Sequence, residues 1–186
     1  MSLLDVLLVF LGAAGVLWGT YRQLLGTLLS LVGLYFTLLV AGMATSFLSE
    51  AYGVGTQIVQ SLWGQPTSIR LIEVGLFAAL GIGCFVALEV GNRYAFPNPG
   101  LKGLGILDGV FGGILGLVLG VALMAVFSNL WRLVVLTSWQ PYATWLFLRR
   151  AYDTSLLAPW LKPALQALRT LLFPFALMGY PRVLTP

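Results

Sequence analysis

The sequence predicts an all-α membrane protein with about four transmembrane helices and a C-terminal amphipathic, interfacial helical tail. Of its 186 residues, 59% are hydrophobic and 9% are charged, whereas a soluble domain carries about 25% charged residues. The mean hydropathy of +0.95 reflects a chain with too little polar surface to cover a globule in water. The apolar runs are continuous and do not alternate over about ten residues, as barrel strands do. The sequence therefore favours a helical bundle.

Four apolar runs predict the spans of a transmembrane domain over residues 1–131. They cover residues 3–20, 23–48, 70–91 and 107–131, and each is close to the roughly 20 residues that cross a bilayer. Only a few residues around Arg22 separate the first two runs, so their helices are expected to be antiparallel neighbours. Glycine and proline residues mark the two longer connections as loops.

Residues 132–186 form the predicted membrane-interfacial tail. Its first part is apolar but interrupted by Gln140-Pro141, which predicts a short re-entrant piece or a helix at the interface. Further on, leucines recur at helical spacing while Lys162 and Arg169 share the opposite face, as in an amphipathic helix lying among headgroups. Trp160 is an expected interfacial anchor. A fifth span is an alternative, and the two cations disfavour it.

Glycine spacing is the clearest motif. Two adjacent stripes step by four residues: Gly105, Gly109 and Gly113, and Gly112, Gly116 and Gly120. Such stripes let a neighbouring helix backbone approach closely in lipid, where packing and weak contacts drive association. Gly15 and Gly19 in the first run offer a weaker stripe that could meet them. Two interpretations stay open: packing inside one bundle, or an interface with a second copy or another membrane subunit.

Ionisable residues fall near the ends of the predicted spans. Five of them are Asp5, Arg22, Glu73, Glu89 and Asp108. Because a charge at mid-membrane costs about 2.5–3.5 kcal/mol on insertion scales, we expect these groups to snorkel to the interface or to cap helices. The alternative pairs Arg22 with Asp108 or Glu89, since all three belong to the same side of the membrane. Such a pair would pin two helical hairpins together.

Charge distribution gives a weak indication of orientation. The short loops around Arg22 and from Arg93 to Lys102 carry a basic excess, which favours a cytoplasmic location for them, whereas the arginines of the tail favour the opposite. The net charge of +4 comes from scattered residues and lacks the basic patch typical of nucleic-acid binding. The expected partner is therefore the lipid bilayer, with no role for nucleic acid.

No catalytic or metal-binding pattern stands out. The sequence has no histidine, which removes the commonest general base and metal ligand. No nucleophile–base set or phosphate-binding loop is recognisable. Cys84 lies in an apolar run and is interpreted as a small core residue. We therefore expect no catalytic residues, no cofactor, no bound metal and no enzymatic activity.

Three short motifs stand out between residues 1 and 129. They are Leu4-Asp5, Gly19-Thr20-Tyr21-Arg22 running on to Leu28-Leu29-Ser30-Leu31, and Leu107-Asp108-Gly109-Val110-Phe111-Gly112. Together they resemble the colicin V production protein (CvpA) family. The sequence departs from the family pattern in two ways. The family usually has Arg-Gly where this chain has Arg22-Gln23, and it usually has arginines where this chain has Gly109 and Leu119.

The resemblance implies a multi-pass protein of the bacterial inner membrane. It would be associated with production or export of a peptide toxin and with envelope homeostasis, and it would not be an enzyme. Two alternatives stay open: a small structural or accessory subunit of a larger membrane complex, and a channel or transporter component built from several copies. Long uncharged spans suit the subunit. A polar stripe would favour transport, and the second span offers only Tyr35, Thr37 and Thr45.

Overall fold

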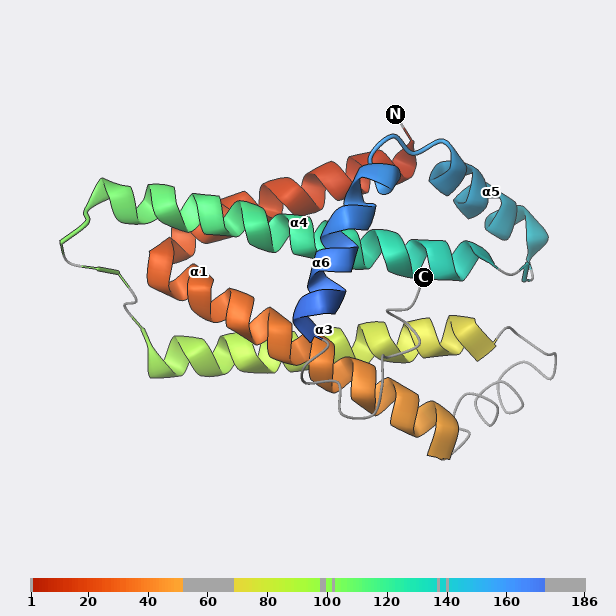
Figure 1. Ribbon diagram of the computed structural model, residues 1–186, viewed down its shortest axis with the longest axis horizontal. Helices are drawn as coiled ribbons and strands as arrows, with labels where there is room; N and C mark the ends of the chain where they lie inside the picture. Colours follow the sequence, from red (N-terminus) through yellow and green to blue (C-terminus); the bar gives the residue numbers. More distant parts are fainter. Residues whose placement is uncertain are drawn as a thin grey trace.

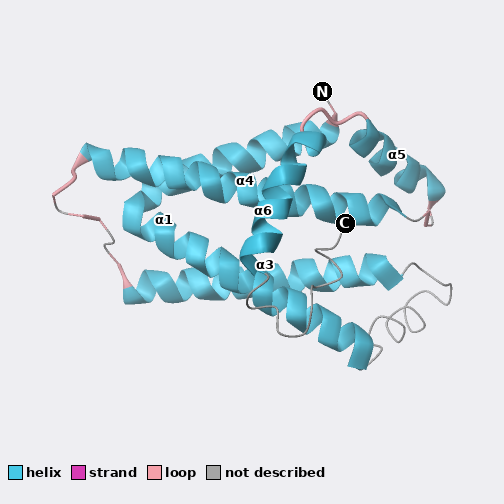
Figure 2. Cartoon of the chain, viewed as in Figure 1, coloured by secondary structure: helices cyan, strands magenta, loops and turns pink. Residues whose placement is uncertain are grey.

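The computed structural model describes residues 2–51, 69–97, 100–101, 103–136, 138–139 and 141–172, and this part of the chain is helical without any strand. The elements are α1 (Leu3–Ala51), α3 (Ile69–Ala95), α4 (Ile106–Leu136), α5 (Tyr142–Asp153), the 3-10 helix η1 (Ala158–Leu161) and α6 (Lys162–Leu172). Figures 1 and 2 show their arrangement. The predicted all-α class is confirmed. Most of the loop expected after the second span, and the tail beyond residue 172, lie outside the described residues.

Helix α1 contains two of the predicted spans. It bends sharply at Gln23, whose backbone is not helical (φ 63°, ψ −176°), and Figure 1 shows the helix folding back on itself. Three helices, α1, α3 and α4, are long and apolar enough to cross a membrane. Because the bend divides the longest of them into two arms, the chain has four apolar helical segments.

The first arm of α1 packs antiparallel against α4 (Figure 1). At one end of this pair Leu4 and Leu8 are fully buried and cluster with Ala125 of α4. Helix α4 continues to Leu136, which is beyond the predicted end of the fourth span at residue 131. No glycine or proline follows within the helix to end it earlier, and the next breaker is Pro141.

The second arm of α1, α3 and the middle of α4 share the larger apolar core. Its buried side chains include Leu34, Leu38, Leu39, Val74, Phe77 and Leu119. Helix α3 is the least enclosed span: 22% of its most apolar window is buried, against 44% in α1 and in α4. An apolar cavity of about 610 Å³ also separates parts of the three helices. Much of α3 is therefore left to face lipid or another helix.

The tail packs on the spans. The apolar stretch predicted after Arg132 is not one separate piece, because its first residues extend α4 and a new helix begins only at Tyr142. Helix α6 crosses α4 (Figure 1), and its last residue, Leu172, is buried in the larger core. The Tyr35 hydroxyl donates a hydrogen bond to the Leu171 carbonyl (3.1 Å). The leucine face of the amphipathic helix thus contacts protein.

Candidate functional site

The first arm of α1 and α4 cross at glycines that leave no room for a side chain. A Cβ atom added to Gly15 would lie 2.6 Å from the Gly120 Cα, and one added to Gly19 would lie 2.6 Å from the Gly116 Cα. Gly112 lies in the same contact. Backbones this close exclude even a methyl group, which is how small residues allow helices to associate in lipid. The structure therefore brings these predicted glycines together within one chain.

The predicted stripe of Gly105, Gly109 and Gly113 lies at the margin of this crossing. A Cβ on Gly113 would meet the Thr20 side chain at 2.8 Å, and one on Gly109 would lie 3.8 Å from the Thr20 carbonyl oxygen. Gly105 takes no part in the packing, which corrects its place in the stripe. It lies in the turn before α4 with a φ of 52°, and its Cβ would have no heavy atom within 4 Å. Glycine suits that left-handed backbone.

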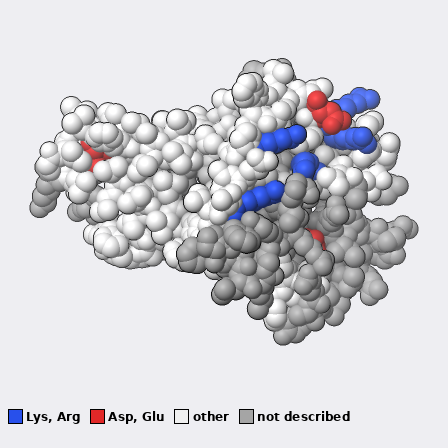
Figure 3. All heavy atoms as spheres, viewed as in Figure 1, with Lys and Arg blue, Asp and Glu red and all other residues white. Residues whose placement is uncertain are grey.

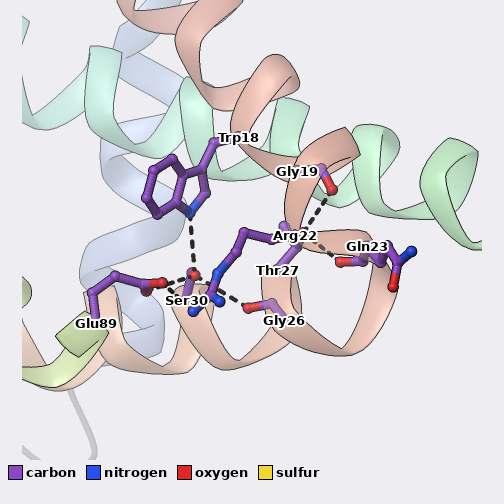
Figure 4. Close-up of polar contacts among 8 residues, drawn as sticks. All are labelled: Trp18, Gly19, Arg22, Gln23, Gly26, Thr27, Ser30 and Glu89. Carbon is purple, nitrogen blue, oxygen red and sulfur yellow. Dashed lines mark hydrogen bonds and ion pairs between the residues drawn. The ribbon is translucent and has the colours of Figure 1, made fainter. Parts of the chain in front are cut away.

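Arg22, at the bend of α1, forms a buried ion pair with Glu89 of α3 (Figure 4). The two side chains are 8% and 9% exposed. The Ser30 hydroxyl donates to the Glu89 Oε2 (2.9 Å), and the Trp18 indole N–H donates to the Ser30 Oγ (3.4 Å). The Trp18 ring also lies 6.0 Å from the Arg22 guanidinium carbon, in cation–π range. Of the two predicted partners of Arg22, the structure selects Glu89.

Asp108 binds backbone groups and does not pair with Arg22. Its carboxylate is 2% exposed and accepts hydrogen bonds from the N–H groups of Leu24 (2.9 Å) and Leu101 (2.8 Å). Leu24 is the first residue after the bend, so its N–H is one of the donors that a helix start leaves without an intrahelical partner. Asp108 of α4 therefore caps the second arm of α1.

Asp5 plays a similar part at the opposite end of the α1–α4 pair. It forms a capping box with Ser2: the Asp5 N–H donates to the Ser2 Oγ (3.1 Å), and the Ser2 N–H donates to the Asp5 carboxylate (3.0 Å). The same carboxylate accepts the Ser155 hydroxyl (2.6 Å) and the N–H groups of Leu156 and Leu157 (both 3.1 Å). The start of α1 is thereby tied to the segment before η1.

Of the two expected roles, Asp5 and Asp108 cap helix starts, whereas snorkelling is wrong for Glu73 and Glu89, which are buried in the bundle. Glu73 and Glu89 are 8% and 7% exposed, and Glu73 accepts the Ser49 hydroxyl at 2.6 Å. Buried polar and charged groups need partners, and Asp5, Glu73, Glu89 and Asp108 all have them. These groups are fixed attachment points between helices and are not free acids or bases.

The residues predicted to be interfacial in the tail lie on η1 and α6, away from the glycine crossing. Lys162 and Arg169 of α6 line a polar cleft together with Arg132 of α4, and Trp160 of η1 is 82% exposed. Among the described residues, no group of three or more His, Cys, Asp or Glu could hold a metal ion. Cys84 is a partly buried free thiol on α3.

Sequence reasoning missed a small-residue stripe on α3. Gly75, Ala79, Gly83, Ala87 and Gly91 step by four residues, and all five are exposed. No heavy atom lies within 4 Å of a Cβ built on any of the three glycines. Small-x-x-x-small spacing is the sequence signal for this feature, and it becomes visible only when alanine is counted with glycine.

The bundle of apolar helices, closed by glycine contacts and buried charges, defines a multi-pass helical membrane protein. The chain belongs to the colicin V production protein family, whose model matches residues 3–166. The match runs from the start of α1 into α6 and confirms the resemblance drawn from the short motifs. Comparison with curated proteins and with solved structures gave no match.

Proposed function

We propose that the protein acts in the bacterial inner membrane, without catalysis, in production or export of a colicin V-type peptide toxin or in homeostasis of the cell envelope. The family match over residues 3–166 carries this proposal. Under this proposal the described carboxylates of the spans hold helices together through ion pairing, capping or hydroxyl contacts. The protein then works as a rigid membrane-embedded unit on which other components act.

Deletion and complementation test this function. A strain that lacks the protein is expected to release less toxin or to become sensitive to detergent, and the wild-type chain restores the phenotype. A chain with Glu89→Leu, which leaves the buried Arg22 without its carboxylate, should fail to complement. The matched control is Asp153→Leu, because Asp153 forms only an exposed pair with Arg149. A deletion strain with normal toxin release and normal envelope resistance contradicts the proposal.

The α3 stripe favours a second, compatible proposal, namely that the protein assembles with a further helix in the membrane. The small residues from Gly75 to Gly91 are exposed along α3, and the larger side chains of Ile82, Val86 and Val90 are exposed beside them. Small and large residues side by side on one helix suit a second copy, in which the large side chains of each helix pack over the small residues of the other. Under this proposal the family function is performed by a homo-oligomer.

Cysteine crosslinking in native membranes tests the second proposal. In a Cys84→Ser background, Gly83→Cys should give a disulfide-linked dimer under mild oxidation. Val118→Cys on α4 is the control, because that position is also exposed (53%) but lies outside the stripe. A crosslink at both positions or at neither contradicts a dimer through α3. Native mass measurement in mild detergent then separates a homo-oligomer from a complex with unlike subunits, and liposome flux tests the channel alternative.

A further inference from the structure

A polar cleft lies between the C-terminal part of α4 and the η1–α6 segment. Its volume is about 210 Å³, far above the roughly 10–15 Å³ that a single water needs. The polar side chains that line it are Ser128, Asn129, Arg132, Tyr152, Lys162, Gln166 and Arg169. Three of these are cations, and none of the described lining residues is acidic. Figure 3 shows that basic side chains gather on this face over α4, α5 and α6.

The cleft lies at the depth of a membrane surface. Asp108 marks the start of the α4 span, and at 1.5 Å per residue Ser128 lies about 30 Å further along the helix. That is about the thickness of the hydrocarbon core. Ala125, Leu161 and Leu165 line the cleft beside the polar groups. The cleft therefore borders the apolar interior while its cations stand at headgroup level.

The chemistry of the lining suits an oxyanion. Arg132 and Arg169 line the cleft from two different helices, and guanidinium groups bind phosphate oxygens through charge-assisted hydrogen bonds. Lys162 adds a compact third charge. Burial raises the pKa of Tyr152, which keeps its hydroxyl protonated and able to donate. The nearest acidic neighbour in sequence, Asp153, already pairs with Arg149 at 3.6 Å.

The cleft is also held in shape by contacts from outside it. Asp5 fixes the segment before η1 through the N–H groups of Leu156 and Leu157. Ala158 and Leu161 pack with Ala125 in the smaller apolar core. A site whose walls are fixed in this way loses little conformational freedom when it binds a ligand.

We propose that this cleft binds a phosphate group at the membrane surface, carried by an anionic phospholipid headgroup or by a soluble phosphate. Basic pockets between membrane helices bind such headgroups by the same charge and hydrogen-bond chemistry. The binding is independent of the toxin-related role proposed above and of assembly through α3.

Lipid retention in nanodiscs tests the site. The full chain is placed in phosphatidylcholine nanodiscs with a minor share of phosphatidylglycerol, then released and examined by native mass spectrometry. Wild type should retain phosphatidylglycerol, and the Arg132→Gln/Arg169→Gln variant should retain on the order of tenfold less, as expected for the loss of two charge-assisted contacts. Arg149→Gln/Arg150→Gln removes the same charge from α5 and should retain lipid as wild type does.

Two further measurements show whether the bound phosphate group comes from a lipid or from solution, and keep the proposal testable if the double variant unfolds. If inorganic phosphate displaces the lipid from wild type, the site accepts soluble phosphate as well, whereas resistance to phosphate assigns it to the headgroup. Should the double variant unfold, Lys162→Gln is compared with Arg150→Gln, since both residues are exposed. Equal retention by the cleft variant and its matched control overturns the proposal.

Discussion

The two ends of the α1–α4 pair use the same device for different purposes. Asp5 is the third residue of α1 and Asp108 is the third residue of α4, and the two helices run antiparallel. Each carboxylate is almost fully buried and accepts backbone N–H groups from the start of another segment. Asp108 thereby organises the bend between two spans, whereas Asp5 attaches the tail to the bundle.

At each end of the pair, the carboxylate accepts N–H groups near a helix start whose N-cap residue is not a favoured capping type. Leu157, the N-cap of η1, makes no side-chain capping bond, and Gln23, which precedes the second arm of α1, is not one of the residue types that favour N-caps. In lipid an uncapped helix start is costly, because no water is available to satisfy its N–H groups. Asp108 supplies an acceptor to Leu24 from a distant part of the chain, and Asp5 does the same for Leu156 and Leu157. The nearby Ser155 hydroxyl accepts the Ala158 N–H that begins η1. Within the described part of the chain, the Asp108 end alone adds a buried ion pair.

The glycine crossing lies between the two ends of the α1–α4 pair. Disrupting it should therefore cause the largest loss of stability. Gly116→Leu would drive a side chain into the backbone of Gly15 and Gly19. The loss of stability should exceed the roughly 1–3 kcal/mol typical of overpacking, because backbone atoms cannot move aside as side chains do. Thermal unfolding in mild detergent measures it. Val118→Leu on the exposed face of the same helix is the control, because Val118 is 53% exposed and lies outside the proposed α3 interface; equal losses in the two variants would contradict a tight crossing.

The buried Arg22–Glu89 pair is present at the bend end of the α1–α4 pair. Breaking it should cause the second-largest loss of stability. Glu89→Leu leaves the Arg22 charge buried without its partner, which typically costs about 3–5 kcal/mol. Arg22→Met/Glu89→Leu removes both charges and should recover most of that loss. Chemical denaturation of the two variants in the same detergent tests this. A double variant as unstable as the single one would show that the pair matters through its other contacts and not through charge.

Replacing Asp108 should destabilise the whole bundle, whereas replacing Asp5 should destabilise mainly the tail. Asp108→Ala leaves the part-buried N–H groups of Leu24 and Leu101 without their acceptor. The cost for each should lie toward the lower end of the roughly 1–3 kcal/mol of a buried donor, and the unfolding temperature of the whole bundle should fall. Asp5→Ala should mainly release the tail, seen as faster hydrogen exchange from α5 to α6 with the spans still protected. If Asp5→Ala exposes the spans as much as Asp108→Ala does, the two ends are not specialised in this way.

Some features of the fold and of the site could be predicted from the sequence, and others could not. Composition predicts the helical membrane class. Antiparallel spans place Arg22, Glu89 and Asp108 on one side of the membrane, so the sequence offers two carboxylates as partners of Arg22 and does not choose between them. The contact between Asp5 and Ser155 could not be predicted, since it joins residues 150 positions apart and depends on how the tail folds. The period of four predicts close packing around Gly15 and Gly116, but it does not say whether the second helix belongs to the same chain.

Gln23 offers the smallest and most local test, confined to the bend end. A φ of 63° with a ψ of −176° is a conformation that essentially only glycine adopts, and the family usually has glycine after the arginine at this point. Gln23→Gly should remove about 1–3 kcal/mol of backbone strain while adding about 0.4–1 kcal/mol of unfolded-state freedom. The expected result is a modest rise in Tm in detergent.

Gln23→Ala is the control for this last comparison, because it removes the side chain but keeps the Cβ atom that makes the conformation costly. Its Tm should not rise. A similar gain from alanine would place the benefit in the contact between the Gln23 side chain and Gly100 and not in the backbone. A gain from glycine alone would mean that the strain lies in the backbone of Gln23. The Asp108 cap on Leu24 and the Arg22–Glu89 pair on either side of Gln23 would then be the contacts that hold the strained turn in place.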